Sequence, residues 1–359
     1  MKILFCTHKL NDGGAERVVS LWMKGFSLQG NQVFLVICTE NDQRDYSLPE
    51  ETPVYNIFPS HKKKISAFVY RIRKLRGIIK NENPDLVITA LGPWGLWAYL
   101  ASLGLKKIVI HTEHNTFERP STAPMTKGMF FYKFWVNKLF KAITVLTQAD
   151  KEYIGDRLHN VNVLPNPLTF NPATSLPPKE KYVLAAGRLD AWHVKGFDNL
   201  MKAWNIVSPK HPDWKLIVAG GGSQESLSFL QGFLSETALE KVDFVGFVND
   251  ILNLYRQSSI FVLSSRYEGF GMVLIEAMSQ GCACVSTDYH GRQREIIAGK
   301  EFGLLSEPDD YIQMAQNLSV MMENAVLRKK IQIASVERSK DYLLERIMEK
   351  WNQIIDNIK

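Results

Sequence analysis

The stretch SSRYEGFGMVLIEAMSQG occupies residues 264–281 and has the order of a strand end, a glycine loop and a helix. An apolar run over 260–264 predicts the strand, and the run that begins at Val273 predicts the helix. Between them, Gly269 and Gly271 allow the backbone to turn tightly and to approach a ligand closely. A strand followed by a loop and a helix is the repeating unit of a parallel α/β sheet, so this segment indicates the fold class.

Two carboxylates flank this glycine loop. Glu268 precedes it, and Glu276 lies inside the predicted helix. The free N–H groups and the positive dipole end of a helix N-terminus suit a diphosphate, whereas carboxylates accept hydrogen bonds from sugar hydroxyls. A ligand with hydroxyls on both sides of a diphosphate is a nucleotide sugar, and the segment therefore predicts a nucleotide-sugar site.

The same alternation of strands and helices extends over the rest of the 359 residues in two series. Their apolar runs lie at 2–7, 31–38, 85–90, 107–112 and 142–147, and then at 181–187, 214–220, 242–247, 259–265 and 282–288. A segment rich in Pro, Asn and Ser, 163–178, separates the two series. We therefore predict two Rossmann-like, doubly wound α/β domains that face each other across a cleft. The first spans 1–170 and the second 171–341, and a periodic helix over 342–359 is expected to pack back onto the first.

The segment EGFGMVLIEAMSQG also resembles the donor-site signature of the retaining glycosyltransferases of family 4, which have the GT-B fold. The resemblance covers nearly the whole chain, because it extends to GGAERVV, VLPNP, AAGRLD, KGFD, IVAGGG, VGFVND and GRQREIIAG, in that order. It implies an enzyme of bacterial polysaccharide biosynthesis that takes a hexose or N-acetylhexosamine from a nucleotide sugar. The acceptor would be a glycan or a lipid-linked glycan, and the anomeric configuration would be retained.

Arg188 and Lys195 follow the apolar run 181–187. Two cations at a strand end can neutralise a diphosphate leaving group, and the resemblance implies this catalytic role for the pair. The sequence departs from the common pattern of the family here, because two extra residues within DAWHV separate the two cations. We expect Glu268 to position sugar hydroxyls and to stabilise an oxocarbenium-like transition state, while Glu276 binds the ribose.

Other candidates come from the ends of further predicted strands. His114 follows the run 107–112, where the resemblance implies a His that faces the donor sugar, and His111 is the alternative within the predicted strand. The resemblance also places Gly13 and Gly14 over the donor phosphate and sugar. The predicted catalytic residues are thus Glu268, His114, Arg188 and Lys195. The predicted donor-binding residues are Gly13, Gly14, Arg188, Lys195, Gly220, Val248, Glu268, Gly269, Phe270, Gly271, Met272, Val273 and Glu276. The segment 292–295 could face the donor, but a helix start is the favoured interpretation of Glu295.

The sequence gives no indication of a metal or a cofactor. It contains no Asp-x-Asp pair, which holds a divalent metal in many other glycosyltransferases, so protein cations are expected to take that role. It also lacks the G-x-G-x-x-G fingerprint of dinucleotide enzymes. We expect a UDP-sugar donor in preference to a GDP-sugar. Two alternatives remain open: a nucleotide-sugar epimerase of the same fold, and a non-catalytic nucleotide-sugar-binding module.

The charge is concentrated in the first half of the chain. The formal net charge is +6, and residues 1–170 hold 22 Lys and Arg against 14 Asp and Glu. Within that half, 61–80 and 127–141 interleave basic with apolar or aromatic residues. This pattern suits an anionic membrane surface, although an ordinary helix with solvated lysines would show it too. No nucleic-acid-binding motif is present, so we expect no nucleic-acid partner.

The remaining sequence features indicate a cytoplasmic protein. The apolar run at the N-terminus is too short for a signal peptide, and the apolar stretches are too short for a membrane span. The four cysteines lie mostly in apolar runs and are expected to be buried, reduced thiols. We therefore expect a cytoplasmic enzyme that contacts the inner face of the plasma membrane peripherally through its basic domain.

Overall fold

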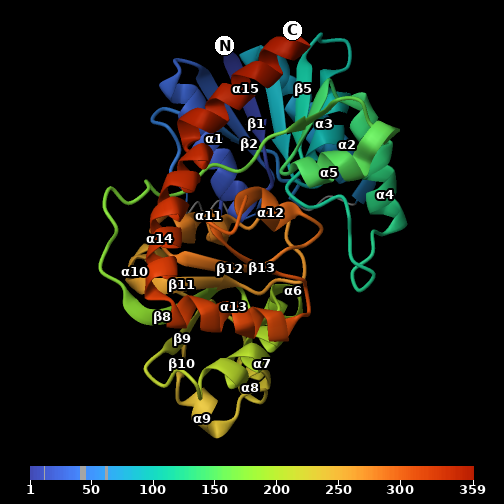
Figure 1. The fold of residues 1–359 in the computed structure, drawn as a ribbon. Helices are drawn as coiled ribbons and strands as arrows, with labels where there is room; N and C mark the ends of the chain where they lie inside the picture. The colour runs from blue at the N-terminus through green and yellow to red at the C-terminus, as the bar shows by residue number, and fades with distance from the viewer. Residues whose placement is uncertain (12, 41–45, 61–63) are drawn as a thin grey trace. The chain divides into compact units, whose positions relative to one another are not determined.

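A computed structural model describes residues 1–11, 13–40, 46–60 and 64–359 of the chain. These residues form two compact units, of which the first is Met1–Pro167 together with Leu344–Lys359 and the second is Leu168–Leu343. Each unit contains one sheet of parallel strands with helices packed against it (Figure 1). The predicted fold class, α/β with two parallel-sheet domains, is confirmed.

The first unit has a seven-stranded sheet of order β3-β2-β1-β4-β5-β6-β7. Its strands are β1 (Lys2–Cys6), β2 (Gln32–Ile37), β3 (Val54–Asn56), β4 (Leu86–Ala90), β5 (Ile108–Thr112), β6 (Ala142–Val145) and β7 (Val161–Val163). Its helices are α1 (Gly14–Leu28), α2 (Lys64–Glu82), α3 (Trp94–Ser102), α4 (Lys127–Phe134), α5 (Gln148–Ile154) and α15 (Leu344–Ile358). The strand order reverses between β1 and β4, and ligands of such sheets bind outside the carboxyl ends of the strands near this point.

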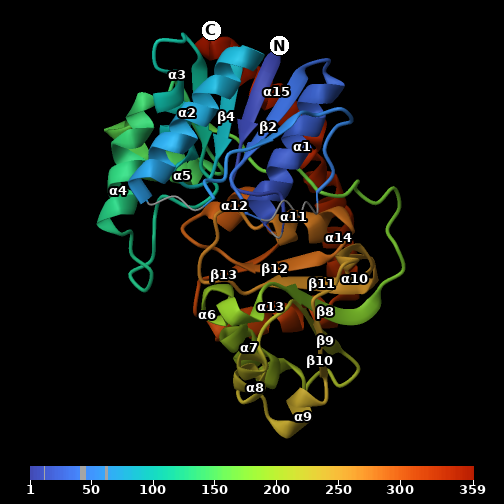
Figure 2. The same ribbon diagram turned by 180° about the vertical axis from the view of Figure 1, so that it is seen from behind.

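Side chains of β1 alternate between two faces of this sheet. Leu4 belongs to a buried cluster that includes residues of α2 and α3, whereas the ring of Phe5 lies 6.0 Å from that of Phe26 in α1. The C-terminal helix α15 completes the α1 face, because its Trp351 ring lies 5.2 Å from the ring of Trp22. Figures 1 and 2 show α1 and α15 on one side of the sheet and α2 and α3 on the other.

The second unit has a six-stranded sheet of order β10-β9-β8-β11-β12-β13. Its strands are β8 (Glu180–Ala186), β9 (Lys215–Ala219), β10 (Val242–Gly246), β11 (Ser258–Leu263), β12 (Ala283–Thr287) and β13 (Gly303–Ser306). Its helices are α6 (Trp192–Lys195), α7 (Phe197–Val207), α8 (Gln224–Gln231), α9 (Glu236–Leu239), α10 (Ile251–Gln257), α11 (Met272–Ser279), α12 (Arg292–Ile296), α13 (Tyr311–Glu323) and α14 (Ala325–Ser339). The order reverses between β8 and β11, so the loops after these two strands flank the expected ligand position.

Several elements differ from the prediction. The segment between β9 and β10 is not one continuous helix: α8 ends before Gly232, and Ser235 caps a new helix, α9, by accepting a hydrogen bond from the Ala238 amide. The short edge strands β3, β7 and β13 were not predicted. The C-terminal helix begins at Leu344 rather than at 342, because Lys340–Tyr342 form a 3-10 turn. Residues 292–295 lie in α12, as the helix-start interpretation predicts.

Candidate donor site and catalytic residues

The glycine loop of the second unit connects β11 to α11. Gly271 caps α11 in the left-handed conformation, with φ of 94°, which favours glycine. The helix therefore starts at Met272, one position before the predicted Val273. Phe270 is buried, and its ring packs against the ring of Tyr342 at 5.6 Å. The loop thus holds the N-terminus of α11, with its free N–H groups, at the carboxyl edge of the sheet.

Glu268 of this loop forms an ion pair with Lys195, the last residue of α6. The Lys195 Nζ lies 2.6 Å from Glu268 Oε1, and Ser265 donates a hydrogen bond of 2.7 Å to the same oxygen. Both contacts use Oε1, so Oε2 takes part in neither. The two side chains are only 23% and 14% exposed, which strengthens their attraction. The structure therefore brings together the predicted cation and the predicted sugar-binding carboxylate.

The two extra residues before Lys195 do not displace it from the strand end. They are accommodated by a 3-10 turn over Leu189–Ala191 and by α6, which ends at Lys195. Ser264 of the β11 end donates a hydrogen bond of 2.8 Å to the Lys195 carbonyl. At Gly196, where φ is 62°, an added Cβ would lie 1.9 Å from the Ser264 carbonyl oxygen. The chain after α6 therefore packs directly on the β11 end, and only glycine fits there.

Arg266, which is not among the predicted site residues, anchors the same loop. Its guanidinium contacts both carboxylate oxygens of Asp198 at 2.7 Å and one oxygen of Asp309 at 2.6 Å. Burial alone would raise the pKa of the Asp198 carboxyl, but the hydrogen bonds and the charge of Arg266 outweigh it and lower that pKa. The partners lie far apart in the sequence, and no local pattern marks them.

Glu276 is the fifth residue of α11 and is buried. Its Oε1 accepts a hydrogen bond of 2.6 Å from Thr169, and its Oε2 accepts one of 3.1 Å from Tyr255. Neither hydroxyl was predicted to contact the site. A ribose that binds to Glu276 would therefore share the carboxylate with these hydroxyls or replace one of them.

Arg188, Gly220 and Val248 follow three neighbouring strands, β8, β9 and β10. Arg188 is exposed and Val248 is half-buried. Gly220 has φ of 153°, and an added Cβ would lie 1.8 Å from the carbonyl oxygen of Gly187. Gly220 is thus required for close backbone packing between the ends of β8 and β9, whatever it contributes to nucleotide binding.

His114 lies in the loop that follows β5, whereas its alternative, His111, lies within β5 as predicted. His114 Nε2 is 3.1 Å from the Thr112 hydroxyl, which itself donates its proton to the Thr89 carbonyl. The hydroxyl oxygen can therefore only accept from His114, so Nε2 carries the proton and Nδ1 is an acceptor. Nδ1 is buried and has no hydrogen-bond partner among the described residues. Burial lowers the pKa of His114 to about 4, which keeps the ring neutral.

Gly13 and Gly14 form the N-terminal end of α1. Gly13 caps the helix, and an added Cβ would lie 1.7 Å from Glu16 Oε2. The Glu16 carboxylate therefore already lies against this helix N-terminus, where its charge is favourable. Gly14 is exposed, and an added Cβ would meet nothing within 4 Å. An added Cβ at Gly13 would displace only the end of the flexible Glu16 side chain, so the packing of the first unit itself requires neither glycine.

The four cysteines are buried free thiols, and burial raises the pKa of Cys282 to about 11. Within residues 1–11, 13–40, 46–60 and 64–359, no three His, Cys, Asp or Glu side chains are grouped so that they could hold a metal ion. In the same ranges, no helix is long and apolar enough to cross a membrane.

Comparison with known families assigns both halves of the chain. Residues 12–169 match glycosyltransferase family 4, and residues 169–338 match the glycosyl transferases group 1. The chain therefore belongs to the family 4 glycosyltransferases, whose second domain is the glycosyl transferases group 1 domain. It is a glycosyltransferase of the hexosyltransferase class with the GT-B fold, as the resemblance predicts.

Individual relatives are similar over the whole chain. A Campylobacter jejuni protein, the GalNAc-α-(1→4)-GalNAc-α-(1→3)-diNAcBac-PP-undecaprenol α-1,4-N-acetyl-D-galactosaminyltransferase, is 28% identical, and the match covers 100% of this chain and 99% of the relative. The amylovoran biosynthesis glycosyltransferase AmsD of Erwinia amylovora is 29% identical over 96% of this chain and 97% of its own length. TarM of S. aureus, solved with fondaparinux, α-GlcNAc-glycerol and UDP, has a TM-score of 0.83 at 16% identity, with 99% of both chains covered.

Proposed function

We propose that this glycosyltransferase transfers a hexose or N-acetylhexosamine from a UDP-sugar to a glycan or lipid-linked glycan, with retention and without a metal ion. The observation that carries the proposal is the pair of Lys195 and Glu268, 2.6 Å apart, with Glu268 in the loop that leads into α11. A cation and a helix N-terminus suit a diphosphate, and a carboxylate suits sugar hydroxyls. Such a site needs no metal to neutralise the leaving group.

The pair also suggests how the donor is recognised. Before the donor binds, Lys195 neutralises Glu268. The donor diphosphate then competes for the Lys195 ammonium, together with Arg188 and the α11 N-terminus. Glu268 is released to accept hydrogen bonds from hydroxyls of the transferred sugar, where its charge stabilises an oxocarbenium-like transition state.

The proposed transfer step is a front-face displacement. The bond between the anomeric carbon and the diphosphate oxygen breaks, and the acceptor oxygen forms its bond on the same face of the sugar. The acceptor proton passes to the departing phosphate oxygen, so that atoms and charges balance. His114 has a neutral ring, and its Nδ1 has no hydrogen-bond partner in the part of the chain that the structure describes, so it serves as a hydrogen-bond acceptor for the donor sugar rather than as an acid.

We assign the donor to the second domain, 171–341, and the acceptor to the first, 1–170, since the second carries the nucleotide-sugar signature. The names of the relatives support the substrate classes. The C. jejuni enzyme is named for a substrate linked to undecaprenol through a diphosphate, and the TarM structure contains UDP. On this basis we assign the enzyme to bacterial polysaccharide or lipid-linked glycan synthesis, with UDP favoured over GDP and no nucleic acid as partner.

We further propose that the first domain contacts an anionic membrane at the cytoplasmic face. The first three residues of the basic stretch 61–80 lie outside the described residues. Beyond them, Ile65 is 82% exposed, and in the aromatic stretch 127–141 Phe131 and Trp135 are 60% and 59% exposed. Leu75 and Phe134 are buried, however, so only part of each stretch is available for a lipid surface.

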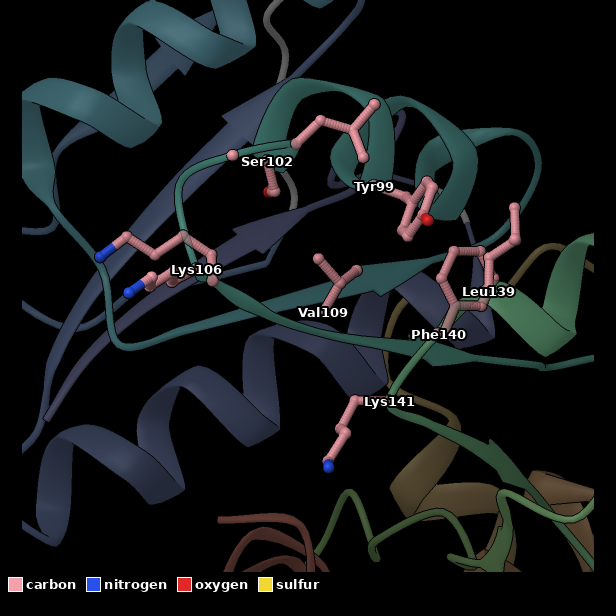
Figure 3. A pocket seen from close by; sticks show the side chains of 10 residues that line it. Tyr99, Ser102, Lys106, Val109, Leu139, Phe140 and Lys141 are labelled. Atoms are coloured by element: carbon pink, nitrogen blue, oxygen red, sulfur yellow. The ribbon is translucent and has the colours of Figure 1, made fainter.

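A cavity of about 420 Å³ near the second stretch supports this contact. Figure 3 shows Tyr99, Val109 and Phe140 around it and Lys106 and Lys141 at its edge. A lining that combines apolar side chains with lysines suits lipid chains and anionic headgroups. Sedimentation with phosphatidylglycerol vesicles should exceed that with phosphatidylcholine vesicles, and a Trp135→Ser, Phe131→Ser variant should lose the difference. Equal sedimentation with both lipids would contradict membrane contact.

The proposed reaction is tested by measuring UDP release from UDP-GalNAc, UDP-GlcNAc, UDP-glucose and UDP-galactose in EDTA. Glu268→Gln should lower the rate by about 100-fold or more, as loss of a transition-state contact does, and the exposed control Glu240→Gln should not change it. UDP release that needs added metal, or that survives in Glu268→Gln, would contradict the proposal.

A further inference from the structure

A second cavity, of about 310 Å³, lies at the carboxyl edge of the first sheet. It is formed by the turn after β4, the end of β5 and the inner side of α4, and its lining includes Gly92, Pro93, Glu113, Met129, Tyr132 and Lys133. All of these belong to one structural unit. In parallel α/β sheets this edge is where ligands bind, and the proposed reaction assigns no residue of this cavity to the donor.

A buried ion pair forms the polar part of the cavity. Glu113 Oε2 lies 3.0 Å from the Lys133 Nζ, and Glu113 Oε1 accepts a hydrogen bond of 2.9 Å from Asn137. The Lys133 and Glu113 side chains are only 6% and 10% exposed. Lys133 also donates to the Asn115 carbonyl at 3.1 Å and lies over the Phe117 ring. Lys133 is thus occupied, and the pair adds no net charge to the cavity.

The Glu113 carboxylate retains acceptor capacity. Burial alone would raise its pKa, but the charges of Lys133 and His111 and the hydrogen bonds of Asn137 and Lys133 outweigh it and lower that pKa, so the group is ionised at neutral pH. A carboxylate has about four lone-pair sites, and the contacts from Lys133 and Asn137 leave some of them available. An ionised carboxylate that can still accept hydrogen bonds favours a ligand with hydroxyl groups and disfavours a phosphate.

The rest of the lining suits a sugar ring. Tyr132, Met129 and Pro93 present apolar surface, and binding cavities typically combine such surface with a few polar groups. Gly92 and Gly128 at the cavity have no side chains, and an added Cβ at either would meet nothing within 4 Å. Glu113 also directly precedes His114, the predicted contact of the transferred sugar.

We propose that this cavity binds one neutral sugar ring of the glycan acceptor, with Glu113 accepting hydrogen bonds from its hydroxyls. The inference rests on the proposed function and adds to it a site for the acceptor within the first domain. Its ligand class, a neutral pyranose, is distinct from the anionic nucleotide diphosphate assigned to the second domain.

The test fills the cavity from a position that tolerates a side chain. Gly128 is the second residue of α4, and leucine favours helices more than glycine does. Gly77, inside α2, is the matched control because an added Cβ there also meets nothing within 4 Å. Saturation-transfer NMR with the methyl α-glycosides of GalNAc, GlcNAc, glucose and galactose measures binding to the wild type, Gly128→Leu and Gly77→Leu. A Glu113→Gln variant removes the charge and keeps the shape.

We expect at least one glycoside to bind the wild type and Gly77→Leu. In Gly128→Leu and in Glu113→Gln its affinity should fall by about tenfold or more, the equivalent of one charged hydrogen bond. Unchanged binding in Gly128→Leu or Glu113→Gln would overturn the inference, and so would the failure of every glycoside to bind the wild type. The thermal shift caused by UDP, measured on the same proteins, separates this result from failure of the proposed function: a retained UDP shift leaves the donor site intact.

Discussion

A double-mutant cycle on Lys195 and Glu268 measures whether the ion pair is formed and whether the donor breaks it. The variants are Lys195→Met, Glu268→Gln and the combination of both. The two groups lie 2.6 Å apart and are 23% and 14% exposed. A hydrogen bond between charged groups contributes about 1.5–3 kcal/mol. Partial exposure of Lys195 moves the expected coupling toward the lower end, about 1–2 kcal/mol.

The coupling is obtained from the unfolding free energies of the four proteins in urea, followed with and without saturating UDP. Without UDP we expect the coupling just given. With UDP, the diphosphate competes for the Lys195 ammonium, and the coupling should fall below about 0.5 kcal/mol, the value of an exposed pair. A coupling near zero without UDP would show that the pair is not formed in solution. A coupling that UDP leaves unchanged would refute the exchange of Lys195 from Glu268 to the diphosphate.

Further predictions concern the neighbouring groups. Tyr255→Phe removes the hydroxyl that donates to Glu276 at 3.1 Å, and the free energy of unfolding in urea should fall by about 1–3 kcal/mol; an unchanged value would mean that the contact is not formed. Burial lowers the pKa of His114 from 6.5 to about 4. As pH falls, the unfolded chain therefore binds a proton at this residue before the folded protein does, and the free energy of unfolding should decrease from about pH 6.5 toward pH 4. His114→Gln should reduce this pH dependence in calorimetry, and an unaltered dependence would contradict the burial of a neutral ring. Gly14→Ala should leave the melting temperature unchanged or raise it while it weakens UDP-sugar binding, whereas Gly220→Ala should destabilise the fold because its Cβ would clash with backbone.

The sequence predicts the strands of both domains well because apolar runs bounded by glycine loops have few other interpretations. The second strand series, from 181–187 to 282–288, corresponds to β8 to β12 within one or two residues at each end. The short strands β3, β7 and β13 escape prediction because runs of three or four residues give no clear periodicity. The break between α8 and α9 depends on a single cap, Ser235, whose effect exceeds that of helix propensity.

The candidate site was predictable in part. Glu268 and Lys195 are recognisable from their motifs, but the ion pair between them arises only when β11 and α6 meet. The strands β9, β10 and β11 lie between Asp198 and its partner Arg266 in the sequence, so no short motif connects the two residues. The same applies to Glu113 and Lys133, whose charges pair in the wall of the cavity at the carboxyl edge of the first sheet. The stretch 127–141 has the pattern of a membrane-binding surface, yet one of its lysines, Lys133, lies in the interior.

The most direct test of the proposed donor site is the thermal stability of the protein in EDTA with UDP, GDP, ADP or NAD. A ligand at about 100 times its dissociation constant adds about 2.7 kcal/mol, which raises the melting temperature of a domain of this size by about 5 °C or more. We predict such a rise with UDP, unaffected by EDTA, and a smaller one in Lys195→Met. A rise that requires added metal, or one that occurs with NAD and not with UDP, would contradict a metal-free UDP-sugar site built on Lys195 and Glu268.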